Sequence, residues 1–163
     1  MHRKLLFIII AALLLLIGCS HNSDSLAIFR NKPFETNING AEVFREITIY
    51  VYHSDGYVNK TVWVEENILE NGSVEQLKLY SENINQSFNS NLLQVEGFEF
   101  KTELKDSKFT LTTTYDYTKT NIKEELEQGK EFFHVKGSIN EEYNITYENL
   151  NEAYTEIGFI KEE

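Results

Sequence analysis

One cysteine, Cys19, carries the most specific chemistry in this 163-residue sequence. A thiol reacts as its thiolate, which is a good nucleophile for taking up a lipid. Cys19 directly follows the small residue Gly18, and a run of 13 apolar residues, Leu5 to Ile17, precedes that glycine. Two basic residues, Arg3 and Lys4, stand before the run. A basic start, a short apolar stretch and a small residue before a cleavage point are typical of a secretory signal.

The four residues Leu16, Ile17, Gly18 and Cys19 resemble the bacterial lipobox, in which signal peptidase II cuts before a lipidated cysteine. We expect residues 1–18 to be a cleaved lipoprotein signal peptide, with Leu16, Ile17 and Gly18 recognised by the peptidase. Cys19 would then carry acyl chains such as palmitate, and two chains suffice for stable anchoring. The apolar run is too short to span a bilayer, which needs about 20 helical residues. An ordinary signal peptide with a chance cysteine is the alternative.

The charge balance limits the possible partners. The whole chain has a formal net charge of −11, and residues 1–18 contain two bases and no acid, so the mature chain of 145 residues would have −13. Nucleic acid is not an expected partner, because phosphate binding needs a basic surface. An acidic body also gains nothing from an anionic membrane. We therefore expect the lipid on Cys19 to hold the protein on the extracytoplasmic side of the cell membrane.

Histidine and acidic side chains could bind a metal ion, but their spacing does not favour it. A zinc site usually contains a close pair of ligands, and no two histidines in this sequence lie three or four positions apart. His21 falls just after Cys19. His53, Asp55 and His134 could bind a metal only if the fold brings them together. We expect neither a metal nor another cofactor.

Catalytic nucleophiles have no recognisable context either. No serine lies among the glycines of a nucleophile elbow, and the single thiol is expected to be acylated. The adjacent carboxylates at 65–66, 124–125 and 141–142 are expected to be solvated charges. The sequence has no phosphate-binding glycine loop and no EF-hand loop. We therefore expect no catalytic residues, and a hydrolase is the least favoured function.

Aromatic side chains offer a different kind of site. Tyr50 and Tyr52 alternate with Ile49, and Tyr57 and Trp63 lie on the strand that follows. If this face is uncovered, these four aromatic residues form a binding face, because exposed apolar patches often mark partner sites. The alternative, which we favour at this point, is that helices cover the aromatic face.

Hydrophobic periodicity indicates an α+β fold. Alternation with a period of two predicts two hairpins, and helical spacing predicts two main helices and one short helix. The hairpins are expected at 42–52 with 57–66 and at 98–104 with 109–117, and the helices at 74–89, 122–128 and 147–157. This β-β-α-β-β-α order predicts a four-stranded antiparallel sheet with the two main helices on one face. We divide the chain into the signal at 1–18, the lipidated cysteine and a tether at 19–32, and one domain at 33–163.

These ordered pieces resemble the YehR-like bacterial lipoproteins. The matching features are the lipobox at Cys19, Asn39-Gly40-Ala41-Glu42-Val43, Asp55-Gly56 with Val58 and Lys60-Thr61, Lys105-Asp106-Ser107-Lys108, Tyr115-Asp116-Tyr117, and Ile157-Gly158-Phe159 with Lys161. The resemblance implies a small α+β lipoprotein domain with no established activity, so it assigns only Cys19.

The expected function is that of a membrane-anchored extracytoplasmic lipoprotein. It would be a non-catalytic binding or structural module of the cell envelope, whose partner is an envelope protein, a peptide or a glycan. The alternative is an accessory factor, an inhibitor or a chaperone-like protein, that acts on an exported partner.

Overall fold

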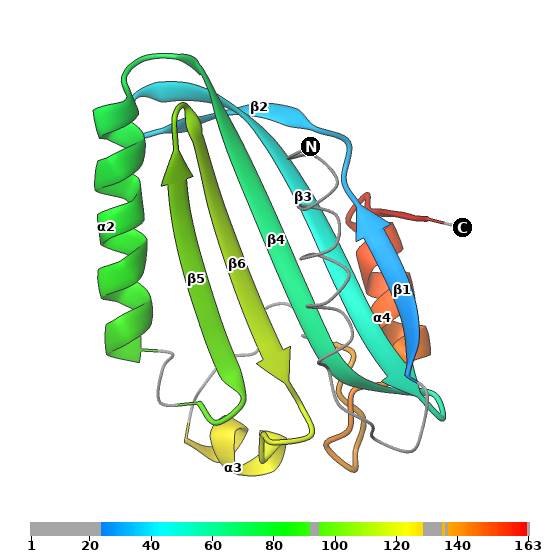
Figure 1. Ribbon diagram of the computed structural model, residues 1–163. Coiled ribbons are helices and arrows are strands. Elements are labelled where there is room, and N and C mark those ends of the chain that lie inside the picture. Colours follow the sequence, from blue (N-terminus) through cyan, green and yellow to red (C-terminus); the bar gives the residue numbers. More distant parts are fainter. Residues whose placement is uncertain (1–23, 92–94, 129–134, 136, 163) are drawn as a thin grey trace, which may run out of the picture.

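A computed structural model describes residues 24–91, 95–128, 135 and 137–162 (Figure 1). In this part of the chain a seven-stranded antiparallel sheet dominates the fold. The strands are β1 (Ser25–Arg30), β2 (Phe34–Ile38), β3 (Ala41–Ser54), β4 (Tyr57–Asn71), β5 (Phe98–Lys105), β6 (Lys108–Asp116) and β7 (Ile160–Lys161). The helices are α2 (Val74–Asn91), α3 (Ile122–Glu127) and α4 (Tyr147–Glu156).

The strands follow the order β5-β6-β4-β3-β1-β7, and β2 pairs with β3 outside that path. β1 and β2 lie end to end along one edge of β3, where β1 pairs with residues 48–53 and β2 with residues 41–45. Asn31 closes the break between them. Its backbone N–H donates to the Ile47 carbonyl at 3.2 Å, and its side-chain oxygen accepts from the Ile47 N–H at 2.7 Å. The ladder therefore stays satisfied across the break.

The hairpin of β3 and β4 is the longest element, with strands of 14 and 15 residues. Its turn residues Asp55 and Gly56 have φ angles of +53° and +83°. Positive φ at both central positions is the signature of the type I′ turn, whose twist matches that of the strands. The same combination occurs at Asn39 and Gly40, with φ angles of +50° and +86°, between β2 and β3.

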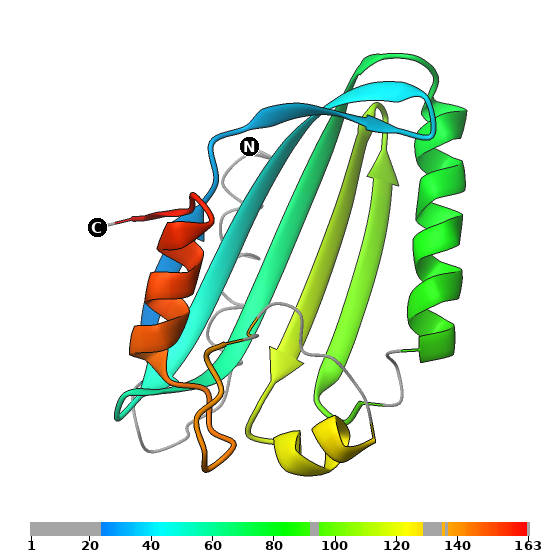
Figure 2. The same ribbon diagram turned by 180° about the vertical axis from the view of Figure 1, so that it is seen from behind.

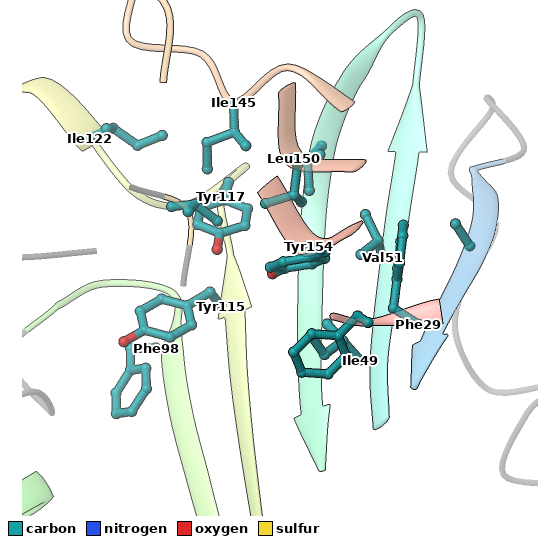
Figure 3. Close-up of a cluster of buried hydrophobic side chains, with 14 of the residues drawn as sticks. Phe29, Ile49, Val51, Phe98, Tyr115, Tyr117, Ile122, Ile145, Leu150 and Tyr154 are labelled. Carbon is teal, nitrogen blue, oxygen red and sulfur yellow. The ribbon is translucent and has the colours of Figure 1, made fainter. Parts of the chain in front are cut away.

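Helices α2 and α4 pack against the same face of the sheet (Figure 2), which we call the inner face. In the larger core cluster, Tyr154 of α4 contacts Phe29 edge-on with ring centroids 5.3 Å apart, close to Ile49 and Val51 of β3 (Figure 3). In the smaller cluster, Leu77 of α2 is fully buried beside residues of β2, β3 and β6. The opposite face of the sheet, which we call the outer face, is free of both helices.

Local signals set the ends of the main helices. At the start of α2, the side-chain oxygen of Gln76 accepts from the Ser73 N–H at 2.7 Å, which is one half of a capping box. At the end of α4, the Phe159 N–H donates to the Tyr154 carbonyl and the Gly158 N–H to the Thr155 carbonyl. These two bonds form a Schellman motif, and Gly158 has the required positive φ of +95°.

The predicted four-stranded sheet is wrong, because the described chain forms seven strands and the order is not β-β-α-β-β-α. Both predicted hairpins are present, but β1, β2 and β7 were not expected. β1 lies inside the segment 19–32 that we expected to be a tether. It alternates buried Ala27 and Phe29 with Leu26, whose exposed fraction is 50%, so it is an ordinary strand with one face in the core.

We predict that Leu77→Ala lowers the free energy of unfolding by about 2–4 kcal/mol, because it leaves a cavity in the smaller core cluster. Leu79 lies two positions along the same helix and is 50% exposed, so Leu79→Ala should change the value by less than about 0.5 kcal/mol. Urea denaturation of both variants measures the difference. Equal effects of the two substitutions would show that α2 does not pack through Leu77.

Candidate functional site

The strongest sequence motif lies outside the described residues. The motif consists of Leu16, Ile17, Gly18 and Cys19. The histidines His21 and His134 also lie outside the described residues. His134, which with His53 and Asp55 could bind a metal only if the fold brought the three together, is thus not among the described residues. Among the described residues, no group of three or more His, Cys, Asp or Glu side chains is close enough to hold a metal ion.

Tyr50 and Tyr52 lie on the outer face. Ile49 and Val51 point to the inner face and are fully buried, so the tyrosines between them point the other way. The favoured expectation that helices cover this aromatic face is therefore wrong for Tyr50 and Tyr52. The Nζ of Lys60, opposite Tyr52 on β4, lies 4.2 Å from the Tyr52 ring centroid, which is a cation–π contact.

Apolar neighbours extend the two tyrosines into a patch across three strands. Tyr52 pairs with Leu26, and Tyr50 pairs with Ile28 on one side and Val62 on the other. Burial is the main cause that raises the pKa of Tyr52, and the Tyr50 phenol adds to it. We call this set the outer patch: Leu26 and Ile28 of β1, Tyr50 and Tyr52 of β3, and Val62 and Val64 of β4.

Trp63 does not belong to the outer patch, so the predicted four-residue aromatic face is divided. Trp63 pairs with Ile49 and faces the core, edge-on to Tyr154 at 6.2 Å and to Phe159 at 5.6 Å between ring centroids. The cause is a β-bulge. Tyr52 pairs with Lys60 and His53 with Val58, so the residue between them on β4 is extra and reverses the faces that follow.

Tyr57 lies at one end of the sheet, where the β3–β4 turn docks on the chain before α4. Its side chain is 42% exposed. The Val58 N–H donates to the Ile145 carbonyl, and the Tyr147 N–H donates to the Gly56 carbonyl, both at 2.9 Å. A cavity of about 190 Å³ lies at this junction. It is lined by Tyr57, Val58, Asn59, Tyr117, Thr118, Ile122, Asn144 and Ile145.

We call this region the turn end: the start of β1, the β3–β4 turn, residues 137–146 and α3. It holds an unusual backbone at Tyr143, which has a φ of +63° and a side chain 39% exposed. A bulky residue in this left-handed region is rare and strained. Asn140 fixes the conformation, because its side-chain oxygen accepts from the N–H groups of Glu142 at 3.0 Å and Asn144 at 2.9 Å. The Nζ of Lys123 lies 5.6 Å from the Tyr143 ring centroid.

His53 is part of an aromatic stack with Tyr147. Its ring lies 3.8 Å from that of Tyr147 at an angle of 16°, and the Nζ of Lys161 lies 5.5 Å from the Tyr147 ring centroid. Burial is the main cause that lowers the pKa of His53, and Lys161 lowers it further while Asp24 opposes the shift. His53 is therefore neutral at pH 7.

An ion pair that the sequence did not indicate lies on the inner face. Arg45 Nε is 3.3 Å from a carboxylate oxygen of Glu65 and donates to Asn67 Oδ1 at 2.8 Å. The Glu65 side chain is only 12% exposed, so the expectation of a solvated charge is wrong at this position. Its neighbour Glu66 points to the outer face and pairs with Lys108.

Comparisons with known proteins add only the fold. No family model and no curated protein matches this chain. A solved structure described as "NMR structure of the protein from Streptococcus pneumoniae TIGR4" has a TM-score of 0.54 at 12% identity and covers 90% of each chain. At this identity the similarity shows a shared fold and no more. The resemblance to YehR-like lipoproteins stays a prediction.

We predict that Tyr143→Gly raises the free energy of unfolding by about 0.5–1 kcal/mol, because glycine adopts a positive φ without the steric penalty of a Cβ atom. Glu142→Gly is the matched control, since Glu142 is an exposed neighbour with an ordinary φ. The control should instead lose about 0.5–1 kcal/mol. Thermal and urea unfolding measure both. A loss at position 143 as large as that at 142 would contradict the strain.

Proposed function

We propose that this chain is a lipid-anchored domain on the extracytoplasmic face of a bacterial cell membrane, where it is a non-catalytic binding or structural module of the envelope. The observation that carries the binding role is the position of the outer patch. Both packed helices lie on the inner face, so the sheet offers apolar and aromatic side chains on the face that they leave open. None of the described helices is long and apolar enough to span a bilayer.

The outer patch has the chemistry of a protein or glycan contact surface. Tyr50 and Tyr52 present amphipathic rings, which are enriched in interfaces because one part is apolar and the hydroxyl can bond a partner. Lys60 adds a positive charge beside Tyr52, at the edge of the outer patch. Towards β6 the same face becomes polar, with Thr112 and Thr114 opposite Val64 and Val62. An apolar centre with a polar margin is the usual anatomy of such surfaces.

The titratable groups with displaced pKa values support a role without catalysis. Burial raises the pKa of Tyr115 to about 12 and that of Tyr154 still further, which keeps both phenols protonated and places them in the core. Burial would raise the pKa of Asp116, but hydrogen bonds from Lys119 and Thr118 outweigh it and lower the pKa. Packing holds the two phenols and hydrogen bonds hold the carboxylate, so none of these three groups is poised to exchange a proton near pH 7.

We predict that Cys19→Ala abolishes lipid attachment and releases the chain from the membrane, or leaves it unprocessed. Labelled palmitate incorporation and membrane fractionation in the source bacterium measure this. Ser20→Ala, at the next position, is the control and should incorporate palmitate normally. Unchanged membrane retention of the Cys19→Ala chain would sink the proposed anchoring.

We predict that partner contact in intact cells centres on Tyr52. A photo-crosslinking amino acid at Tyr52 should capture one discrete partner, with about tenfold higher yield than the same group at Thr112 on the polar part of the outer face, because contact energy concentrates at buried aromatic anchors. Gel electrophoresis and mass spectrometry of the adducts provide the measurement. Equal yields at the two positions would contradict the outer patch as the binding surface.

A further inference from the structure

The distance between the predicted lipid and the sheet restricts how the domain can sit on a membrane. Ser25, the first residue of β1, pairs with His53 next to the β3–β4 turn. Five residues lie between Cys19 and Ser25, and the six residue steps from one to the other reach at most about 20 Å when fully extended. β3 alone, with 14 residues, is about 45 Å long. A lipid on Cys19 therefore keeps the turn end within about 20 Å of the membrane.

Several segments far apart in the sequence meet at that end. Figures 1 and 2 show the start of β1, the β3–β4 turn, the end of β6, α3 and the start of α4 gathered at the same end of the sheet. The β1–β2 break, the β5–β6 turn and the start of α2 lie towards the other end. The short connection to Cys19 would therefore place the turn end, and not the opposite end of the sheet, close to the membrane.

The selected end presents exposed tyrosines. Tyr57 and Tyr143 are 42% and 39% exposed, and Leu26 at the start of β1 is 50% exposed. Tyrosine concentrates at membrane interfaces, because its ring lies among lipid headgroups while the hydroxyl stays in water. The Asn140 hydrogen bonds also hold the backbone of Tyr143 at a positive φ, which is sterically unfavourable for tyrosine. A strained backbone that exposes an aromatic ring is an observation that points to function.

The charges of the turn end argue against an electrostatic mode of binding. The acidic residues there outnumber Lys60 and Lys123, and they are Asp24, Asp55, Glu124, Glu125, Glu127, Glu141 and Glu142. Without a basic cluster, an anionic surface gives no attraction. Contact should therefore depend on the lipid of Cys19 and on the tyrosine rings, and it should occur on a zwitterionic bilayer.

We infer that the turn end rests against the bilayer that holds the lipid of Cys19, with Tyr57 and Tyr143 at the level of the lipid headgroups. This inference rests on the proposed lipidation. In this orientation the strands rise from the membrane surface, and the outer patch faces sideways along it. Ile68, 11 residues beyond Tyr57 on β4, stands about 36 Å farther from the bilayer.

The test uses the acylated full-length product in phosphatidylcholine vesicles. Because Cys19 is acylated, a newly introduced cysteine is the only free thiol and takes a fluorescent maleimide. Tyr143→Cys and Tyr57→Cys report on the turn end, Ile68→Cys on the far end, and Thr112→Cys on the middle of the outer face. Quenching by aqueous iodide measures the exposure of each label. We expect several-fold weaker quenching at 143 and 57 than at 68 and 112.

The controls separate this inference from the lipidation on which it rests. The parent chain should float with the vesicles and take no maleimide, and a reactive Cys19 or a failure to float would overturn the proposed anchoring itself. If the labelled proteins float but all four positions are quenched equally, the orientation is wrong. Protection confined to position 112 would show that the outer face lies flat on the bilayer, and this result would also overturn the inferred orientation. In the Cys19→Ala background, the protection at 143 should disappear.

Discussion

The register of the β3–β4 hairpin is the constraint on which the rest of the structure depends. A two-residue turn at Asp55-Gly56 would by itself pair Tyr50 with Thr61, but the observed partner is Val62. The difference of one residue is the bulge at Asn59. Because side chains alternate with a period of two, this one residue moves Trp63 to the core and Val62 to the outer face. Without it, the inner face would lose the Trp63 ring that packs edge-on against both Tyr154 and Phe159.

Hydrogen bonds of the Asn59 side chain and of the Asn59 carbonyl hold the bulge in place. Its side-chain nitrogen donates to Asp24 at 2.7 Å and to Ser54 at 2.9 Å, and its carbonyl accepts from the Tyr117 N–H at 2.8 Å. An extra residue in a strand leaves backbone groups that must find partners elsewhere. Here the Asn59 carbonyl finds its partner in Tyr117, just after β6, and the Asn59 side chain adds bonds to the end of β3 and to the residue before β1. The bond to Asp24 also fastens the start of β1 to the sheet.

The sequence predicted the local elements better than their arrangement. Asp55-Gly56 located the long hairpin, and Ser73 with Gln76 located the start of α2, because turns and caps are set by residues next to one another. Asn39-Gly40 carried an equally strong turn signal, but Pro33 and the polar residues around β2 concealed the strand before it. β1 was missed because its four apolar residues follow the predicted signal peptide and lipidated cysteine, where a strand and a tether look alike. The side of the sheet on which Trp63 lies depends on the bulge, and no spacing of residues in the sequence predicts that bulge.

Two surfaces of different chemistry follow from this architecture, and they lie at an angle to each other. The outer patch runs along the strands, whereas Tyr57 and Tyr143 lie across their end. A sheet face that lay flat on a bilayer would present Glu99, Lys101 and Glu103 of β5, which share that face at its other margin, to the headgroups. Buried charges of this kind are costly to desolvate. The end-on position inferred above keeps these β5 charges away from the headgroups and leaves the outer patch accessible to a partner in the envelope, so anchoring and binding do not compete for one surface.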